Sequence, residues 1–200
     1  MATEEPTPET RHGVDVSDHL EFIDWMASNP EDAAVTFSAT GTSEDVINHT
    51  TATISEWELG GERMGEDRAH SFEFGLPPEI EEAMGYTAPE DRYESIETAL
   101  AALTACINGT IGYNAVRDGL AFENVETRVT VPVDLRVLFG IHDPDRADEM
   151  YGDIQLDVTV TAPDLSPEEI KQLSTYPSRS PTYNLIMGAQ TDEIDLTVNT

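Results

Sequence analysis

The chain has 200 residues, of which 38% are hydrophobic, enough for the core of one domain or of one protomer in an interwoven dimer. Forty acidic residues against ten basic ones give a formal net charge of −30, and Lys171 is the only lysine. Such a surface repels the phosphates of nucleic acids and of anionic lipids, so we expect neither nucleic acid nor membrane as a partner.

The acidic residues are spread between apolar segments, which indicates a folded acidic surface rather than a disordered tail. At molar salt the Debye length is about 3 Å, so repulsion between these charges is largely screened. We therefore expect the source to be an organism with a very salty cytoplasm, such as a halophilic archaeon.

The N-terminus has neither the basic segment nor the apolar segment of a secretory signal, so we expect a cytoplasmic protein. Residues 1–14 are polar and contain prolines, and we predict that they are disordered and precede a single domain at 15–200. Cys106 is the only cysteine, which excludes an internal disulfide and fits a reducing compartment.

The N-terminal portion of the predicted domain, residues 15–75, indicates a short helix followed by strands. Ser17 is a plausible N-cap for an amphipathic helix that stops before Pro30. Alternating residues then predict three strands, at 33–40, 47–59 and 69–75. We expect the first two to form an antiparallel hairpin with a turn at 41–45, a glycine-rich turn at 60–65, and Phe72 and Phe74 on one face of the third strand.

A long helix is predicted at 93–118, after a loop with a helical turn at 79–84. Apolar or small residues recur at helical spacing, and no charge lies between Glu97 and Arg117. The helix should be roughly 40 Å long and buried on nearly every side, yet it has too many polar residues for a membrane span. We expect Gly109 and Gly112 where another backbone comes close.

The C-terminal portion, residues 125–199, predicts three strands and two helices. The strands are expected at 125–138, with a bulge or edge at Pro132, at 153–162 and at 193–198. Ser166 with Glu169 forms a capping box for one helix, and a second short helix is expected at 181–187. The chain is therefore predicted to be α+β, with antiparallel sheets packed around the central helix. Because one protomer covers only one side of that helix, we expect a homodimer.

Residues 94–135, ESIETALAALTACINGTIGYNAVRDGLAFENVETRVTVPVDL, resemble the central helix and following strand of the OsmC/Ohr hydroperoxide-reductase superfamily. The stretch SPTYNLI from Ser180 resembles the second motif of that family, and the resemblance covers about residues 33–200. It implies an OsmC-like fold, an interwoven homodimer with two active sites at its interface, and a stress-response protein that reduces organic hydroperoxides or hydrogen peroxide.

The resemblance also implies which residues form the site. Cys106 lies nine residues after Glu97, where the family has its peroxide-attacking cysteine and the glutamate of its active-site loop. The family's thiolate partner is an arginine of the N-terminal sheet, for which Arg63 and Arg68 are the candidates. On residue chemistry alone, Cys106 is more often a packing residue, the arginines are solvated turn residues, and Glu97 is favoured by the helix dipole.

Ser180 is the main departure from the family pattern. Two-cysteine members have a resolving cysteine just before the proline of this motif, and a serine hydroxyl cannot form that disulfide. The sequence therefore fits a one-cysteine peroxidase that uses an external thiol, or a non-catalytic dimer that binds a small apolar ligand at its interface. The histidines and the single cysteine show no zinc spacing, and we expect no cofactor and no metal.

Overall fold

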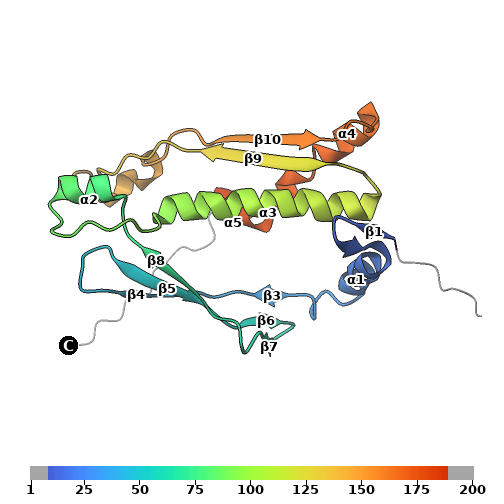
Figure 1. Ribbon diagram of the computed structural model, residues 1–200, viewed down its shortest axis with the longest axis horizontal. Coiled ribbons are helices and arrows are strands. Elements are labelled where there is room, and N and C mark those ends of the chain that lie inside the picture. Colours follow the sequence, from blue (N-terminus) through green and yellow to red (C-terminus); the bar gives the residue numbers. More distant parts are fainter. Residues whose placement is uncertain (1–8, 189–200) are drawn as a thin grey trace, which may run out of the picture. The chain divides into compact units, whose positions relative to one another are not determined.

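The computed structural model describes residues 9–188, which belong to two compact units, Met1–Ala99 and Leu100–Thr200 (Figure 1). The predicted mixture of helices and antiparallel sheets is confirmed. The single domain that we expected at 15–200 stays a prediction.

The N-terminal unit begins with a small hairpin of β1 (Thr10–Arg11) and β2 (Val14–Asp15). His12 and Gly13 both have positive φ, 49° and 80°, as a tight two-residue hairpin turn requires. Residues 10–15 thus form a hairpin; the predicted disorder of residues 1–14 stays a prediction, and residues 1–8 lie outside the described residues.

Asp15 rather than Ser17 caps α1 (Val16–Ser28). The Asp15 carboxylate accepts hydrogen bonds from the backbone N–H groups of Ser17, at 2.9 Å, and Asp18, at 3.2 Å. The predicted cap was therefore wrong by two residues, because Asp15 lies just outside the helix, where its side chain can reach these first-turn donors. The helix ends before Pro30 as expected.

Two three-stranded antiparallel sheets follow in this unit. One contains β3 (Val35–Thr36), β6 (Trp57–Leu59) and β7 (Glu62–Met64); the other contains β4 (Thr40–Ser43), β5 (Thr50–Ile54) and β8 (His70–Phe74). The predicted strands at 33–40 and 47–59 are thus each divided between the two sheets. The predicted turn at 41–45 was wrong, because Gly41 pairs with Ala52 and the chain reverses between Ser43 and Thr50, where Asn48 has a φ of 66°.

Two other expectations for this unit are confirmed. Phe72 and Phe74 stack with ring centroids 6.1 Å apart, which confirms that they share a face of the third strand. The predicted helical turn is α2 (Pro78–Met84), ended by Gly85 with a φ of 90°. The glycine-rich turn at 60–65 includes β7, which the sequence did not predict.

The central helix is α3 (Ser95–Asp118), close to its predicted ends. Its buried face points into the core of the C-terminal unit with Leu103, Ile107, Ile111 and Ala115. The expected burial on nearly every side is not met within one chain, since Ala101, Ala105 and Tyr113 are exposed, Tyr113 to 61%.

Among residues 9–188 of one chain, no other backbone comes close to the glycines of α3, which differs from the expectation. A Cβ on Gly109 would lie 3.8 Å from the Tyr113 ring, and one on Gly112 would lie 3.9 Å from the Phe122 ring. These are ordinary contacts with side chains.

By length and composition α3 also meets the criterion for a membrane span, with a mean hydropathy of 1.2 over its most apolar window. Core helices of soluble proteins meet the same criterion.

The sheet of the C-terminal unit is the pair β9 (Asn124–Thr130) and β10 (Gln155–Thr161), antiparallel over seven residues. Figure 1 shows this pair running along α3, and alternate strand residues pack on its core face. β9 stops at Thr130 rather than at 138, because Pro132 cannot donate to a ladder. The connecting loop is closed by a hydrogen bond of 2.7 Å from the Asp134 N–H to the Met150 carbonyl.

Three short helices follow. They are α4 (Pro167–Leu173), with the predicted capping box of Ser166 and Glu169, the 3₁₀ turn η2 (Pro177–Arg179), and α5 (Pro181–Met187), at its predicted ends. The strand predicted at 193–198 lies outside the described residues.

Candidate functional site

A row of polar residues on α3 faces η2 and α5. Cys106, Thr110 and Asn114 are four residues apart, so they lie above one another on one side of the helix. The Thr110 hydroxyl donates to the Cys106 carbonyl at 2.8 Å, and the Asn114 amide donates to the Thr110 carbonyl at 2.8 Å. The Asn114 side-chain oxygen accepts a hydrogen bond of 2.9 Å from Arg179 in η2.

A buried tyrosine attaches η2 to the end of α3. Tyr176 is fully buried, and its hydroxyl donates to Asp118 at 2.6 Å. Asp118 also accepts from Gln172 at 2.7 Å and pairs with Arg117, and its pKa lies well below the usual range, first because of the Arg117 hydrogen bonds. Burial, together with the Asp118 contact, raises the pKa of Tyr176 to about 12, so the tyrosine remains a neutral donor.

Ser180 follows η2 directly and is fully buried. It is the N-cap of α5: its side-chain oxygen accepts a hydrogen bond of 3.2 Å from the Tyr183 N–H. Its carbonyl accepts from the backbone N–H of Asn184 at 3.1 Å and from the Asn184 amide at 2.9 Å. The position of Ser180 is therefore fixed from both its side chain and its backbone.

The Cys106 thiol is partly buried against this turn. Burial by itself raises the pKa of the thiol, but the polar groups around it, those of Ser180 and Thr182 first and then Thr110, outweigh burial. The net effect lowers the pKa of Cys106 below its ordinary value of 9.0. Donors that favour the charged form make a thiol more nucleophilic at neutral pH.

Sequence reasoning missed Thr110 and Thr182 as neighbours of the thiol. The four-residue spacing from Cys106 to Thr110 was a usable signal, because it places small polar groups on one helix face. Thr182 had no such signal, since its contact depends on how α5 packs on α3.

Arg63, Arg68 and Glu97 all belong to the N-terminal unit, whereas Cys106 belongs to the C-terminal unit. Arg63 is paired with Glu56, and Arg68 donates to the Ser55 carbonyl at 2.9 Å. The pairing of either arginine with the Cys106 thiolate stays a prediction.

Glu97 lies in the first turn of α3 with an exposed side chain. Its backbone N–H donates to the Glu94 carboxylate at 2.9 Å. Glu94, which the sequence analysis did not single out, therefore provides the acceptor at this helix start, and the role of Glu97 in the site stays a prediction.

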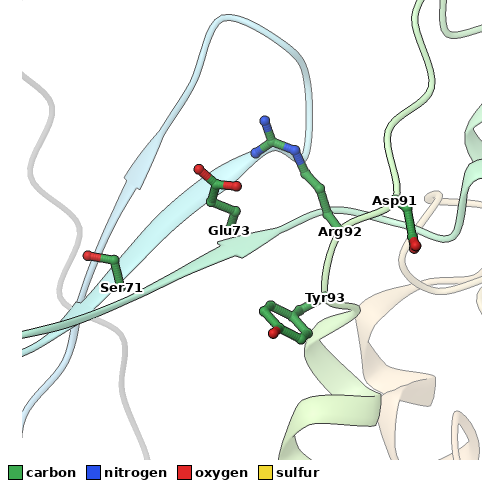
Figure 2. A pocket seen from close by; sticks show the side chains of 5 residues that line it. All are labelled: Ser71, Glu73, Asp91, Arg92 and Tyr93. Carbon is green, nitrogen blue, oxygen red and sulfur yellow. The ribbon is translucent and has the colours of Figure 1, made fainter.

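The N-terminal unit contains a polar recess of about 440 Å³, lined by Ser71, Glu73, Asp91, Arg92 and Tyr93 (Figure 2). The Arg92 guanidinium is already paired with Glu44, at 2.9 Å, and with Glu90, at 2.8 Å. These contacts, Glu44 first, raise the pKa of Arg92 above its usual range. The recess therefore has no uncompensated cation for an anionic ligand.

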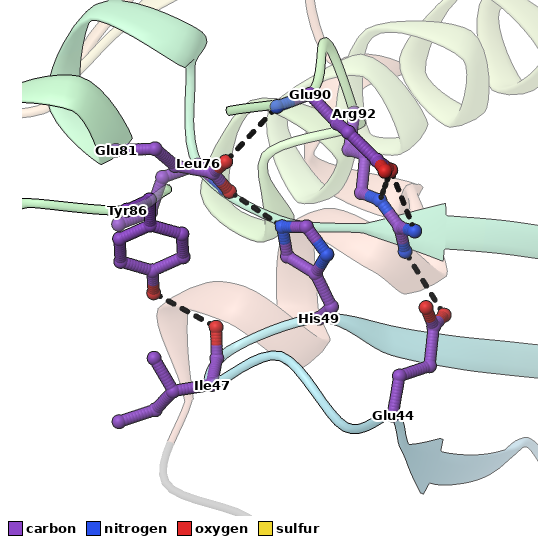
Figure 3. Close-up of polar contacts among 8 residues, drawn as sticks. All are labelled: Glu44, Ile47, His49, Leu76, Glu81, Tyr86, Glu90 and Arg92. Atoms are coloured by element: carbon purple, nitrogen blue, oxygen red, sulfur yellow. Dashed lines mark hydrogen bonds and ion pairs between the residues drawn. The ribbon is translucent and has the colours of Figure 1, made fainter. Parts of the chain in front are cut away.

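Next to Arg92 lies a buried acid and base pair (Figure 3). His49 Nε2 donates to Glu81 at 2.7 Å, and both side chains are at most 1% exposed. Glu81 also accepts from the backbone N–H groups of Leu76, at 3.3 Å, and Glu90, at 3.1 Å. The pair ties α2 to the turn before β5 and is closed to solvent, so we assign it a structural role.

A smaller cavity of about 120 Å³ lies within the loop between β9 and β10. It is lined by Asp134, Arg136, Val137, His142, Arg146, Glu149 and Met150. Its arginines are paired with its carboxylates, Arg136 with Asp134 and Arg146 with Glu149. Within residues 9–188, no group of three or more histidine, cysteine, aspartate or glutamate side chains is placed to hold a metal ion.

Three solved structures are similar to this chain, and the first of them shows its fold. An OsmC-like protein from Mycoplasma pneumoniae is 18% identical, with a TM-score of 0.51 over 76% of this chain and 88% of that one. The organic hydroperoxide resistance protein OhrB of Bacillus subtilis is 15% identical, with a TM-score of 0.45 over 76% and 91%. An OsmC protein from Legionella pneumophila, described as an organic hydroperoxide resistance protein and predicted redox protein, is 15% identical, with a TM-score of 0.48 over 76% and 90%.

No curated protein matches the chain in sequence. A family match does exist, for residues 88–194, and its description is OsmC-like protein. It is shorter than the expected resemblance over residues 33–200, but it spans more than half of the chain and includes Glu97, Cys106 and Ser180. Together with the long central helix and the antiparallel sheets, it shows that this chain belongs to the OsmC-like protein family.

Proposed function

We propose that the protein is a one-cysteine thiol peroxidase that reduces organic hydroperoxides or hydrogen peroxide in stress response. The observation that supports this proposal most directly is a partly buried Cys106 thiol within the OsmC-like match at residues 88–194, and the polar groups around the thiol lower its pKa. A thiolate attacks the O–O bond of ROOH, so that Cys106 becomes a sulfenic acid and ROH leaves with a proton from water. An external thiol then forms a mixed disulfide with release of water, and a second thiol restores Cys106.

Glu97 orients the site in this proposal, and Arg63 or Arg68 is the cation that pairs with the thiolate. The support for these roles is the family match at Glu97 and the position of both arginines in the sheet region before α2. An arginine freed from Glu56 or from the Ser55 carbonyl has five donors to offer a thiolate.

The active form in this proposal is a homodimer in a salty cytoplasm. The exposed face of α3, with Ala101, Ala105 and Tyr113, supports a second copy as its cover. The net charge of −30 supports a halophilic source, since high salt screens the repulsion.

The test is peroxide consumption with a small thiol as reductant in molar KCl, comparing the wild type with Cys106→Ser. Ser178→Ala is a suitable control, because Ser178 lies in η2 but its hydroxyl donates to the Thr175 carbonyl at 2.9 Å. We expect turnover in the wild type and the control and none in Cys106→Ser. Equal and negligible rates in all three proteins refute the peroxidase.

A second candidate function is a non-catalytic dimer that binds a small apolar ligand at its interface. The open apolar face of α3 favours it, because a ligand as well as a second helix can cover that face. Negligible peroxide turnover together with saturable binding of an apolar dye to the dimer is its expected signature.

A further inference from the structure

A buried ring nitrogen of His142 has no hydrogen-bond partner among residues 9–188, and the residue lines the cavity of about 120 Å³ in the loop between β9 and β10. The base of this loop is fixed by two backbone hydrogen bonds, from the Asp134 N–H to the Met150 carbonyl at 2.7 Å and from the Gly152 N–H to the Pro132 carbonyl at 3.0 Å. The cavity therefore belongs to a folded segment that holds its polar groups in place.

The hydrogen-bonding role of this nitrogen, Nε2, follows from the other side of the ring. Arg146 Nη1 lies 3.2 Å from His142 Nδ1. Since a guanidinium can only donate, Nδ1 is the acceptor, and the ring is neutral with its hydrogen on Nε2. A buried N–H without an acceptor is costly, so an acceptor inside the cavity stabilises the loop.

Arg136 brings further donors to the cavity. Its Nε and Nη2 donate to the Asp134 carboxylate, which also accepts the Arg136 backbone N–H at 3.0 Å. In the described part of the chain no bond engages Arg136 Nη1, and the side chain is 57% exposed, so this group is open to solvent. Arg92 in the larger recess differs, because Glu44 and Glu90 engage all three of its side-chain nitrogens.

The charges and the size of the cavity determine which acceptor fits. Arg136 with Asp134 and Arg146 with Glu149 are two neutralised pairs, and the histidine ring carries no charge. A multivalent anion would therefore meet no net positive charge, in a chain of net charge −30. A volume of about 120 Å³ takes only a few water-sized particles. A small monovalent acceptor without hydrogens of its own matches both the donors and the size.

We propose that this cavity is a binding site for one small monovalent anion, which is chloride in a chloride-rich medium. The His142 Nε2–H and the Arg136 Nη1 group donate to it, and N–H donors to a charged acceptor form the stronger class of hydrogen bond. The anion thereby joins the start of the loop to its middle. The lining residues take no part in the proposed peroxide chemistry, so the site does not depend on that proposal.

The experiment measures the chlorine NMR line width of chloride with the full chain, while KCl replaces potassium gluconate at a constant ionic strength of about 1 M. Gluconate is too large for the cavity. We expect broadening that saturates with chloride and is reversed by bromide. His142→Phe removes the Nε2–H and should lose most of the saturable broadening. The matched control His70→Phe replaces an exposed histidine of β8 and should keep it.

A second variant changes the affinity in the opposite direction. Asp134→Asn leaves Arg136 without its counter-charge, so the chloride concentration at half-saturation should fall about fivefold, as for one exposed ion pair. This variant decides the question if His142→Phe does not fold. Line widths in the wild type equal to those in folded His142→Phe overturn the proposal and leave water as the acceptor of the His142 hydrogen. A half-saturation in Asp134→Asn that is unchanged or higher overturns it as well.

Discussion

Removing the charge of Glu81 should destabilise the N-terminal unit strongly, although the residue has no role in the proposed chemistry. In Glu81→Gln, three hydrogen bonds to a charged acceptor become bonds to a neutral one, each weaker by about 1 kcal/mol. One Glu81 oxygen accepts from His49 and Leu76, and the other accepts from Glu90. The NH₂ group of a glutamine must take the place of one of these oxygens, where it faces a donor. The total cost is about 3–5 kcal/mol, the three weakened bonds together with one buried donor left without an acceptor.

For a chain of this length that cost corresponds to a fall in Tm of roughly 6–20 °C. The matched control is Glu82→Gln, which removes the same charge from the next residue of α2, where the side chain is exposed. The control should stay within about 0.5 kcal/mol of the wild type. A Tm for Glu81→Gln within about 2 °C of the control, by circular dichroism in molar KCl, would refute the reasoning, since even the low end of the expected cost is larger.

The pH dependence gives a second check with a definite sign. Burial raises the pKa of Glu81, but the hydrogen bonds from His49, Glu90 and Leu76 outweigh it and lower the pKa below its ordinary value of 4.5. The stabilisation is therefore present above about pH 4.5, where the unfolded chain ionises, and is lost as pH falls through the folded value. The difference in Tm between wild type and Glu81→Gln should shrink in that range.

Four further outcomes follow from the sequence and structure. Light scattering at molar salt should give about twice the chain mass of 22.0 kDa, and a stable monomer at micromolar concentration would contradict the interwoven dimer. Dialysis from molar to about 10 mM KCl should unfold the chain, because the Debye length grows from about 3 to about 30 Å; a native melt in dilute buffer would contradict this. Ser166→Ala should lower Tm by about 2–4 °C through the loss of the capping box, while Ser174→Ala at the other end of α4 should not. Graded peroxide should add one and then two oxygens per chain, the first removable by a small thiol and both absent in Cys106→Ser; a covalent dimer on non-reducing gels would contradict the expected separation of the two thiols.

The elements predicted best from the sequence have signals within a few residues of their ends. Ser166 with Glu169 marks the start of α4, Pro181 the start of α5, and Gly119, with a φ of 72°, the end of α3. These ends depend on local hydrogen bonds and local backbone geometry, which the sequence specifies directly.

The strands were predicted less well because their breaks depend on partners distant in the sequence. Alternation continues from Thr50 to Leu59, yet the chain leaves β5 after Ile54 and enters β6 at Trp57, where the partner strand changes. Alternation reports which face a residue lies on but not which strand it pairs with.

The same distinction applies to the site. Cys106 and Ser180 could be recognised from motifs, whereas their contact with each other and with Thr182 depends on the packing of α5 against α3. The apolar face of α3 was recognised as needing cover, but the pattern alone did not tell which residues of that face a single chain buries.

The attachment of η2 to α3 through Tyr176 and Asp118 has a consequence for the residue at position 180. These side chains fix the turn without help from residue 180, so exchange of the hydroxyl for a thiol costs only the cap hydrogen bond, about 1 kcal/mol. Under the proposed function, the same scaffold can therefore carry either an externally reduced site with serine at 180 or a self-resolving site with cysteine there, without rebuilding the turn.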